Sequence, residues 1–319
     1  MSCGLSAIRL TWISAKINAV QTIERRVCGL TSTCLGLCMN FLERIASRKP
    51  PETIYHYTSQ AGFLGIVKNR SIWATKAQYQ NDSKEFQHAL DLSKIVIYEM
   101  EDKVTNEEER LLRLIKRSLE GIQNVNIFVS SFSEYEDMLS QWRGYCPKGN
   151  GFSLGFDYSL LNHIVEKQRF KFYPCVYDAS EQRQIIKEIA GTTLELFRDD
   201  LNKSINIKLA LKNRSAEYLT KMYSVAPIIK HSTFSEENEW RAVSMPISSN
   251  HPQVSFREGI SMLIPYFNIN FGDTKPLKKI KIGPTPHIDL SRDSTVGFLS
   301  VNNIGFREVS SSQIPFRSW

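Results

Sequence analysis

Three short stretches of this chain combine residue types that could carry chemistry. Residues 56–58 read His-Tyr-Thr and are preceded by a further tyrosine. Residues 140–145 contain Trp142, and residues 234–241 contain Glu239 followed by a tryptophan and an arginine. Together the stretches offer one histidine, the carboxylate of Glu239 and several aromatic rings.

These residue types suit a nucleotide ligand and chemistry at its sugar. A carboxylate beside an anomeric carbon stabilises an oxocarbenium-like transition state. An aromatic face stacks on a flat base or nicotinamide ring, and a neutral histidine can hydrogen-bond a ribose hydroxyl. If Glu239 begins a strand, alternation places Glu239 and Arg241 on one face and Trp240 on the other.

Each of these residues also has a purely structural interpretation. His56 could be a hydrogen-bonded strand residue, and Trp142 and Trp240 could be core aromatics. Glu239 and Arg241 could form an ion pair, which contributes little when exposed. The two interpretations differ in one respect: a functional site requires His56 and Glu239 to converge, whereas a structural role predicts no shared cleft.

Several common site signatures are absent from the sequence. There is no GxxxxGK[ST] or GxGxxG motif, which argues against P-loop and dinucleotide-fold sites. There is no HExxH motif, which argues against a zinc protease. The six cysteines form no CxxC pair, so no metal is expected and a reducing compartment is favoured.

The positive charge of the chain is concentrated at its beginning. The chain has 40 Lys+Arg and 33 Asp+Glu, a net charge of +7. Residues 1–49 hold seven basic and two acidic residues, or +5, which leaves 33 basic against 31 acidic residues, or +2, for the rest. This near-neutral body does not support nucleic-acid binding. No run of 18 apolar residues occurs, so we expect no transmembrane helix and a cytoplasmic protein.

The elements that must position these residues can be read from the hydrophobic pattern. A strand is expected at residues 53–58, followed by a helix capped by Ser59. Further strands are expected at 71–75, 126–132, 152–157 and 170–177, with a short helix at 138–145. Longer helices are expected at 83–102, from 106 onward, and at 180–222 with a break near Asn202 or Asn213. Strands are expected again at 240–243, 254–256, 262–269, 280–282 and 306–309, with a helix at 291–302.

This order of elements predicts an α+β fold with a mixed β-sheet and a helical insertion at about 180–222. Lys49-Pro50-Pro51 marks a boundary between an N-terminal helical or flexible extension, residues 1–49, and a single domain, residues 50–319.

Taken together, the motifs resemble the bacterial family known as domain of unknown function 2971. Five of them occur in the family's order, over about residues 52–317. They are Ile54-Tyr55-His56-Tyr57, the Asn81-to-Glu85 run, Trp142 and Tyr145 with Gly151-Phe152 and Gly155-Phe156, the Phe234-to-Arg241 run, and the Ser312-to-Arg317 ending.

The layout is also similar to that of ADP-ribosyltransferases. This resemblance implies that NAD is the substrate and that His56 and Glu239 are catalytic, with His56 holding the ribose and Glu239 stabilising the oxocarbenium ion. It implies that Tyr79 or Trp73, near the second strand, stacks on nicotinamide. The implied NAD-binding set is His56, Tyr57, Thr58, Trp73, Tyr79, Trp142 and Arg241.

The resulting expectation is an NAD-dependent ADP-ribosyltransferase or NAD glycohydrolase that acts as a toxin or anti-phage defence effector on an unknown macromolecular acceptor. The alternative is a non-catalytic binding or regulatory module.

Overall fold

The computed structural model describes residues 44–45, 47–80, 83–122, 125–146, 151–306 and 308–315. These residues fall in one compact unit, Arg44–Trp319. The N-terminal extension, apart from its last few residues, lies outside the described part of the chain, as do Asn81, Asp82, Phe316 and Arg317 of the family motifs.

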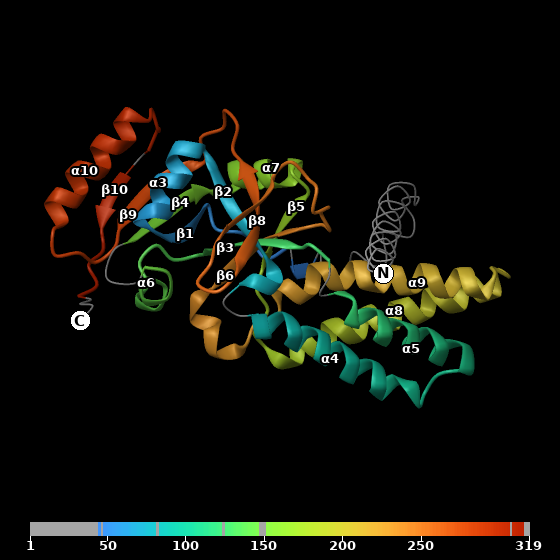
Figure 1. The fold of residues 1–319 in the computed structure, drawn as a ribbon. Helices are drawn as coiled ribbons and strands as arrows, with labels where there is room; N and C mark the ends of the chain where they lie inside the picture. The colour runs from blue at the N-terminus through green and yellow to red at the C-terminus, as the bar shows by residue number, and fades with distance from the viewer. Residues whose placement is uncertain are drawn as a thin grey trace, which may run out of the picture. The chain divides into compact units, whose positions relative to one another are not determined.

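A ten-stranded mixed sheet forms the centre of the described unit (Figure 1). The strand order is β10-β9-β4-β1-β3-β2-β8-β7, and β6 pairs with β3 and β5 outside this path. The neighbours are antiparallel except β9 and β10, which are parallel. The strands are β1 (Thr53–Ser59), β2 (Ser71–Lys76), β3 (Phe128–Ser133), β4 (Gly151–Asp157), β5 (Phe170–Pro174), β6 (Glu239–Ser244), β7 (Val254–Glu258), β8 (Leu263–Asn270), β9 (Leu277–Ile282) and β10 (Glu308–Ser311).

The sheet branches at β3, which pairs with β1 and β2 along one edge and with β6 along the other. Along one edge, β3 pairs with β2 through Phe128 and Val129 and with β1 through Ser133 alone. Along its other edge, β3 pairs with β6 over five residues. Because β1 is registered with β3 only at Tyr55↔Ser133, the two strands diverge beyond that pair. This divergence creates the space in which the candidate site lies.

Three helices pack against the apolar core of the sheet: α3 (Gln60–Asn69), α7 (Tyr158–Lys167) and α10 (Ile288–Val301). The predicted cap of α3 is confirmed, since the Ser59 side chain accepts a hydrogen bond from the Gly62 amide. Phe63 of α3 stacks on Phe152 of β4 at 4.2 Å between ring centroids. Helix α7 was not predicted from the sequence, although the Asp157 side chain caps it by accepting from the Leu160 amide.

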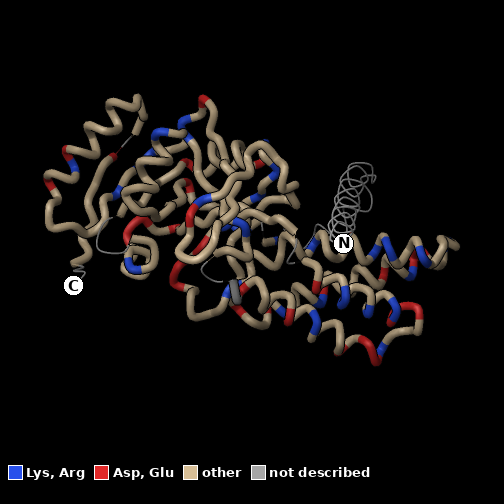
Figure 2. The backbone as a smooth tube through the Cα atoms, in the orientation of Figure 1, with Lys and Arg blue, Asp and Glu red and all other residues tan. Residues whose placement is uncertain are grey.

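Four further helices pack on one another (Figure 1): α4 (Ser83–Glu101), α5 (Asn106–Glu120), α8 (Ala179–Asn202) and α9 (Ile207–Val225). Ser93 of α4 is hydrogen-bonded to Tyr218 of α9 at 2.6 Å, so the two chain segments share one interior. Residues of both charge signs are distributed along these helices (Figure 2).

The prediction of α and β elements around a mixed sheet is confirmed. The expected insertion is present as α8 and α9. Of the two predicted break positions, Asn202 is correct, and Asn213 lies inside α9. The structure adds that α4 and α5, which come much earlier in the chain, complete the same helical layer. None of the described helices is both long and apolar enough to cross a membrane.

Candidate functional site

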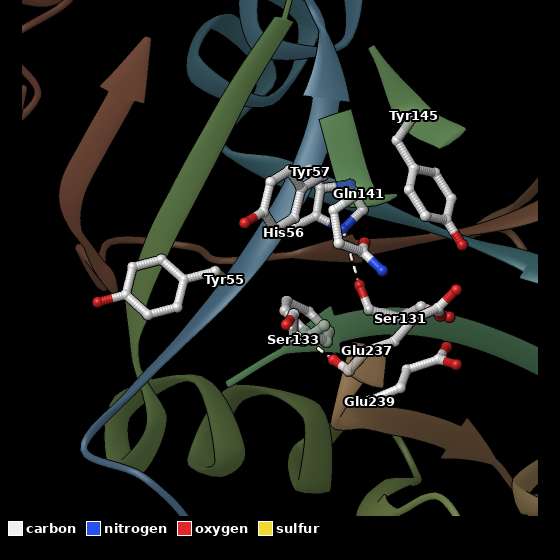
Figure 3. Close-up of a pocket in the computed structure, with 10 residues that line it drawn as sticks. Tyr55, His56, Tyr57, Ser131, Ser133, Gln141, Tyr145, Glu237 and Glu239 are labelled. Carbon is white, nitrogen blue, oxygen red and sulfur yellow. Dashed lines mark hydrogen bonds between the residues drawn. The ribbon is translucent and has the colours of Figure 1, made fainter. Parts of the chain in front are cut away.

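A small pocket opens where β1 leaves β3 (Figure 3). It is bounded by β1, β3, the start of β6 and the short helix α6 (Leu139–Tyr145). Its lining residues are Tyr55, His56, Tyr57, Ser131, Phe132, Ser133, Gln141, Tyr145, Glu237 and Glu239. The pocket therefore brings together His56 and Glu239, which are far apart in the sequence.

His56 fills the gap between the diverging strands. Its Nδ1 lies 2.9 Å from the carbonyl oxygen of Ser131, and because a carbonyl can only accept, Nδ1 must donate. Ser131 lies on β3 between Val129, which pairs with β2, and Ser133, which pairs with β1. Burial lowers the pKa of His56 below its usual value of 6.5, so the ring is neutral near pH 7. Its Nε2 is then left as a hydrogen-bond acceptor.

Glu239 is a buried carboxylate, 5% exposed, with both oxygens bonded to cations. Its Oε1 accepts from Arg241 Nε at 2.7 Å, and its Oε2 accepts from Arg241 Nη2 at 3.0 Å and from Lys230 Nζ at 2.7 Å. Burial alone would raise the pKa of Glu239, but the charges of Arg241 and Lys230 outweigh burial and lower it to about 2. Glu239 is therefore an anion at any physiological pH.

Lys230 lies at the centre of the charged cluster and is only 1% exposed. Its ammonium group donates to Glu237 at 2.6 Å as well as to Glu239, and it lies 5.0 Å from the centre of the Phe234 ring. Burial would lower the pKa of Lys230, but the Glu239 carboxylate outweighs burial and raises it. The lysine thus remains charged.

A tight turn brings Glu237 to the pocket ahead of Glu239. Glu237 ends a 3₁₀ helix (Ser232–Glu237), and Asn238 follows in the left-handed conformation with φ of 40°. The Ser133 hydroxyl donates to the Glu237 carbonyl at 2.9 Å, which fixes this turn to the end of β3. Two carboxylates two residues apart therefore face one lysine.

Arg241 connects the pocket to the helical layer. Its guanidinium binds Glu239 through two nitrogens, donates to the Pro227 carbonyl at 2.6 Å and reaches Glu85 of α4 at 3.2 Å. Glu85 and Arg241 are far apart in the sequence, so this ion pair joins two distant segments of the chain. The cluster of three carboxylates and two cations carries a net charge of −1.

The α6 side of the pocket is held by buried aromatic residues. Trp142 is fully buried, donates its Nε1 to Asp137 at 2.7 Å and meets Tyr57 edge-on at 4.8 Å between centroids. Asp137 also accepts from the Ser312 hydroxyl at 2.7 Å, so the closing family motif supports the same corner. The Tyr57 hydroxyl donates to the Tyr135 carbonyl at 2.9 Å. These contacts give α6 a fixed place beside β1.

Of the residues predicted to form the site, three line the pocket: His56, Tyr57 and Glu239. Five others do not, and each is used elsewhere. Trp142 is core and presents no free face, and the Arg241 donors are engaged in the charged cluster. The remaining three are Thr58, whose carbonyl accepts from the Cys146 thiol, Trp73, which stacks on Tyr266, and Tyr79, which lies on the 3₁₀ helix Ala77–Tyr79.

The expectation that His56, Tyr79 and Glu239 converge is thus met by His56 and Glu239 and corrected for Tyr79. Tyr145 of α6, which is 37% exposed, is one of the aromatic residues that line the pocket. Sequence reasoning did not assign Gln141, Tyr145 or Glu237, although all three lie inside the quoted motifs. It also missed Lys230, because nothing in the pattern distinguishes a buried lysine from a surface one.

The described residues contain no group of three or more His, Cys, Asp and Glu side chains arranged to hold a metal ion. Cys146 and Cys175 are buried thiols, and burial raises the pKa of Cys146 to about 12. A thiol in that state is a poor nucleophile.

Comparison with known proteins identifies one family. No curated protein and no solved structure matches the chain. Residues 141–242 match the family described as "Protein of unknown function (DUF2971)". The matched segment is shorter than the motifs suggested, and it runs from Gln141 through β4 to Arg241 and its neighbour in β6. The chain thus carries the DUF2971 signature over these residues, as its motifs predicted.

Proposed function

We propose that the protein binds NAD in this pocket and cleaves the bond between nicotinamide and ribose. ADP-ribose would pass to a macromolecular acceptor or to water. The observation that carries the proposal is the convergence of His56 and the permanently ionised Glu239 in one pocket.

The chemistry follows from the charge of Glu239. When the glycosidic bond breaks, nicotinamide leaves with the bonding electron pair and the ribose C1′ gains positive charge. A preorganised carboxylate near C1′ stabilises that charge without needing to take or give a proton. The acceptor then forms a bond to C1′ and releases its proton to solvent. His56 contributes a hydrogen-bond acceptor for a ribose hydroxyl through Nε2.

Tyr145 takes the stacking role that the sequence analysis gave to Tyr79 or Trp73. Its ring lines the pocket and remains partly exposed, so a flat nicotinamide ring can approach it. A toxin or defence role would follow from the same reaction, because either loss of NAD or modification of an essential acceptor arrests growth.

The test is transfer of label from NAD labelled in its adenylate half, using the purified full chain and a cell lysate. The wild type is compared with Glu239→Gln, which keeps the size of the side chain and removes its charge. We expect labelled protein or free labelled ADP-ribose with the wild type and a loss of about 100-fold or more with Glu239→Gln.

The control for this comparison is Trp73→Ala, which removes an exposed ring outside the pocket and should leave the rate unchanged. Thermal unfolding of each variant shows whether it is folded. A folded wild type that yields neither labelled protein nor ADP-ribose refutes the proposal.

The complete pairing of Glu239 with Arg241 and Lys230 also suits a rigid, non-catalytic binding site. That second candidate predicts that the wild type binds NAD in calorimetry and releases no nicotinamide. Glu239→Gln would then change affinity alone.

A further inference from the structure

Gln141 is a buried polar side chain without a hydrogen-bond partner among the residues that the structure describes. It lies in α6, is 6% exposed and lines the pocket beside His56 (Figure 3). Its amide atoms are not among the described side-chain atoms that are both enclosed and without a partner, so they open onto the space of the pocket. An amide left open to a pocket is therefore a candidate for ligand contact.

The position of Gln141 is fixed by its neighbours. Trp142, the next residue, is fully buried and bonded to Asp137, and the backbone amide of Trp142 donates to the Met138 carbonyl at 3.0 Å. A side chain mounted on such an anchored turn loses little freedom when a ligand binds, which favours precise recognition.

Several other polar groups of the pocket are already hydrogen-bonded within the protein, which limits the kind of ligand that can bind beside Gln141. The carboxylates of Glu237 and Glu239 are both bonded to Lys230. The Ser133 hydroxyl is bonded to the Glu237 carbonyl. The groups that a neutral ligand can use next to one another include the Nε2 acceptor of His56 and the Gln141 amide, which has two N–H donors and one acceptor oxygen.

A vicinal diol complements this pair. Each hydroxyl of a diol can donate once and accept as well, so one hydroxyl can donate to His56 Nε2 while the other pairs with the amide. We propose that Gln141 binds the 2′ hydroxyl of a substrate ribose while His56 binds the 3′ hydroxyl, and that Gln141 thereby selects ribose over 2′-deoxyribose. This inference rests on the proposed function, because it assumes that a nucleotide occupies the pocket.

The test is calorimetric binding of ADP-ribose and of its analogue that lacks the 2′ hydroxyl of the terminal ribose, after NAD binding by the wild type is measured. The main variant is Gln141→Leu, and Gln184→Leu on the exposed surface of α8 is the matched control. We expect Gln141→Leu to weaken ADP-ribose binding about tenfold and to change binding of the deoxy analogue by less than about threefold. The wild-type preference for the diol should therefore largely disappear.

Gln141→Met is a second variant that keeps the approximate length of the side chain and removes its amide group. It should also lose the preference. Equal weakening of both ligands by Gln141→Leu, or an unchanged preference in either variant, overturns the role of Gln141 while the proposed function stands. A wild type that binds neither NAD nor ADP-ribose refutes the proposed function, and this inference with it.

Discussion

At the scale of single residues, the proposed cleavage of NAD depends on the negative charge of Glu239. A carboxyl group whose pKa is lowered to about 2 cannot act as a proton donor near neutral pH. It can stabilise a cation, and this fits an oxocarbenium-like transition state better than general acid catalysis. The same low pKa connects the site to the stability of the fold.

Glu239 should make the fold sensitive to acid. Its pKa is about 2 in the folded chain and about 4.5 as a free group. Between pH 4.5 and 2 the unfolded chain takes up a proton at Glu239, whereas the folded chain keeps this carboxylate charged. The contribution of Glu239 to the free energy of unfolding is therefore full above pH 4.5 and is lost as the pH falls toward 2. The expected loss is roughly 3 kcal/mol, measured by urea unfolding at stepwise lower pH.

Glu239→Gln is the control for the acid experiment. Its unfolding free energy should be lower at pH 7 and should fall less steeply between pH 4.5 and 3 than that of the wild type. Parallel curves for the two proteins would show that Glu239 does not hold the low pKa on which the proposed chemistry depends.

At the scale of the elements, the sequence predicts most strands and helices because their signals are local. Alternating β-branched and aromatic residues indicate β1, and Ser59 gives the start of α3. The helix α7 was missed, although Asp157 at its start is a capping residue, since the two flanking strands dominated the pattern. The joining of α4 and α5 with α8 and α9 could not be predicted, because it depends on contacts between distant segments.

The ion pair between Glu85 and Arg241 should connect the helical layer to the site. Both side chains are buried, so removing one charge leaves the other incompletely compensated. We expect Glu85→Gln to lower the free energy of unfolding by about 1–3 kcal/mol. Urea unfolding provides the measurement.

Glu109→Gln is a matched control for this prediction, because Glu109 forms an exposed pair with Arg113 one turn along α5. Its effect should stay within about 0.5 kcal/mol. Equal effects of the two substitutions would mean that the buried connection between α4 and β6 contributes nothing specific.

At the scale of the whole molecule, the family resemblance was the only basis on which the sequence could predict that His56 and Glu239 lie in one site. Nothing local to either strand shows that β3 pairs with β1 along one edge and with β6 along the other. The same limit applies to the aromatic residues: Trp73 lies within β2 and Tyr79 just beyond it, and neither lines the pocket, which opens where β1 leaves β3 next to α6.

The proposed role of Tyr145 as the ring that stacks on nicotinamide is testable by comparing Tyr145→Ala with Tyr79→Ala. Tyr145 lines the pocket and Tyr79 lies outside its lining. Loss of one stacking ring should weaken NAD binding about threefold to tenfold for Tyr145→Ala, and Tyr79→Ala should leave it unchanged. Calorimetry with NAD measures both, and a larger effect at Tyr79 would contradict the assignment.

The central claim is that this pocket cleaves NAD at its nicotinamide–ribose bond. The most direct measurement is a time course of nicotinamide release from NAD, followed by NMR with purified wild type and Glu239→Gln, because release accompanies transfer to any acceptor. We expect the wild type to release nicotinamide steadily and the folded Glu239→Gln variant to release it about 100-fold more slowly or slower still. No release by the folded wild type, or equal release by both proteins, would contradict it.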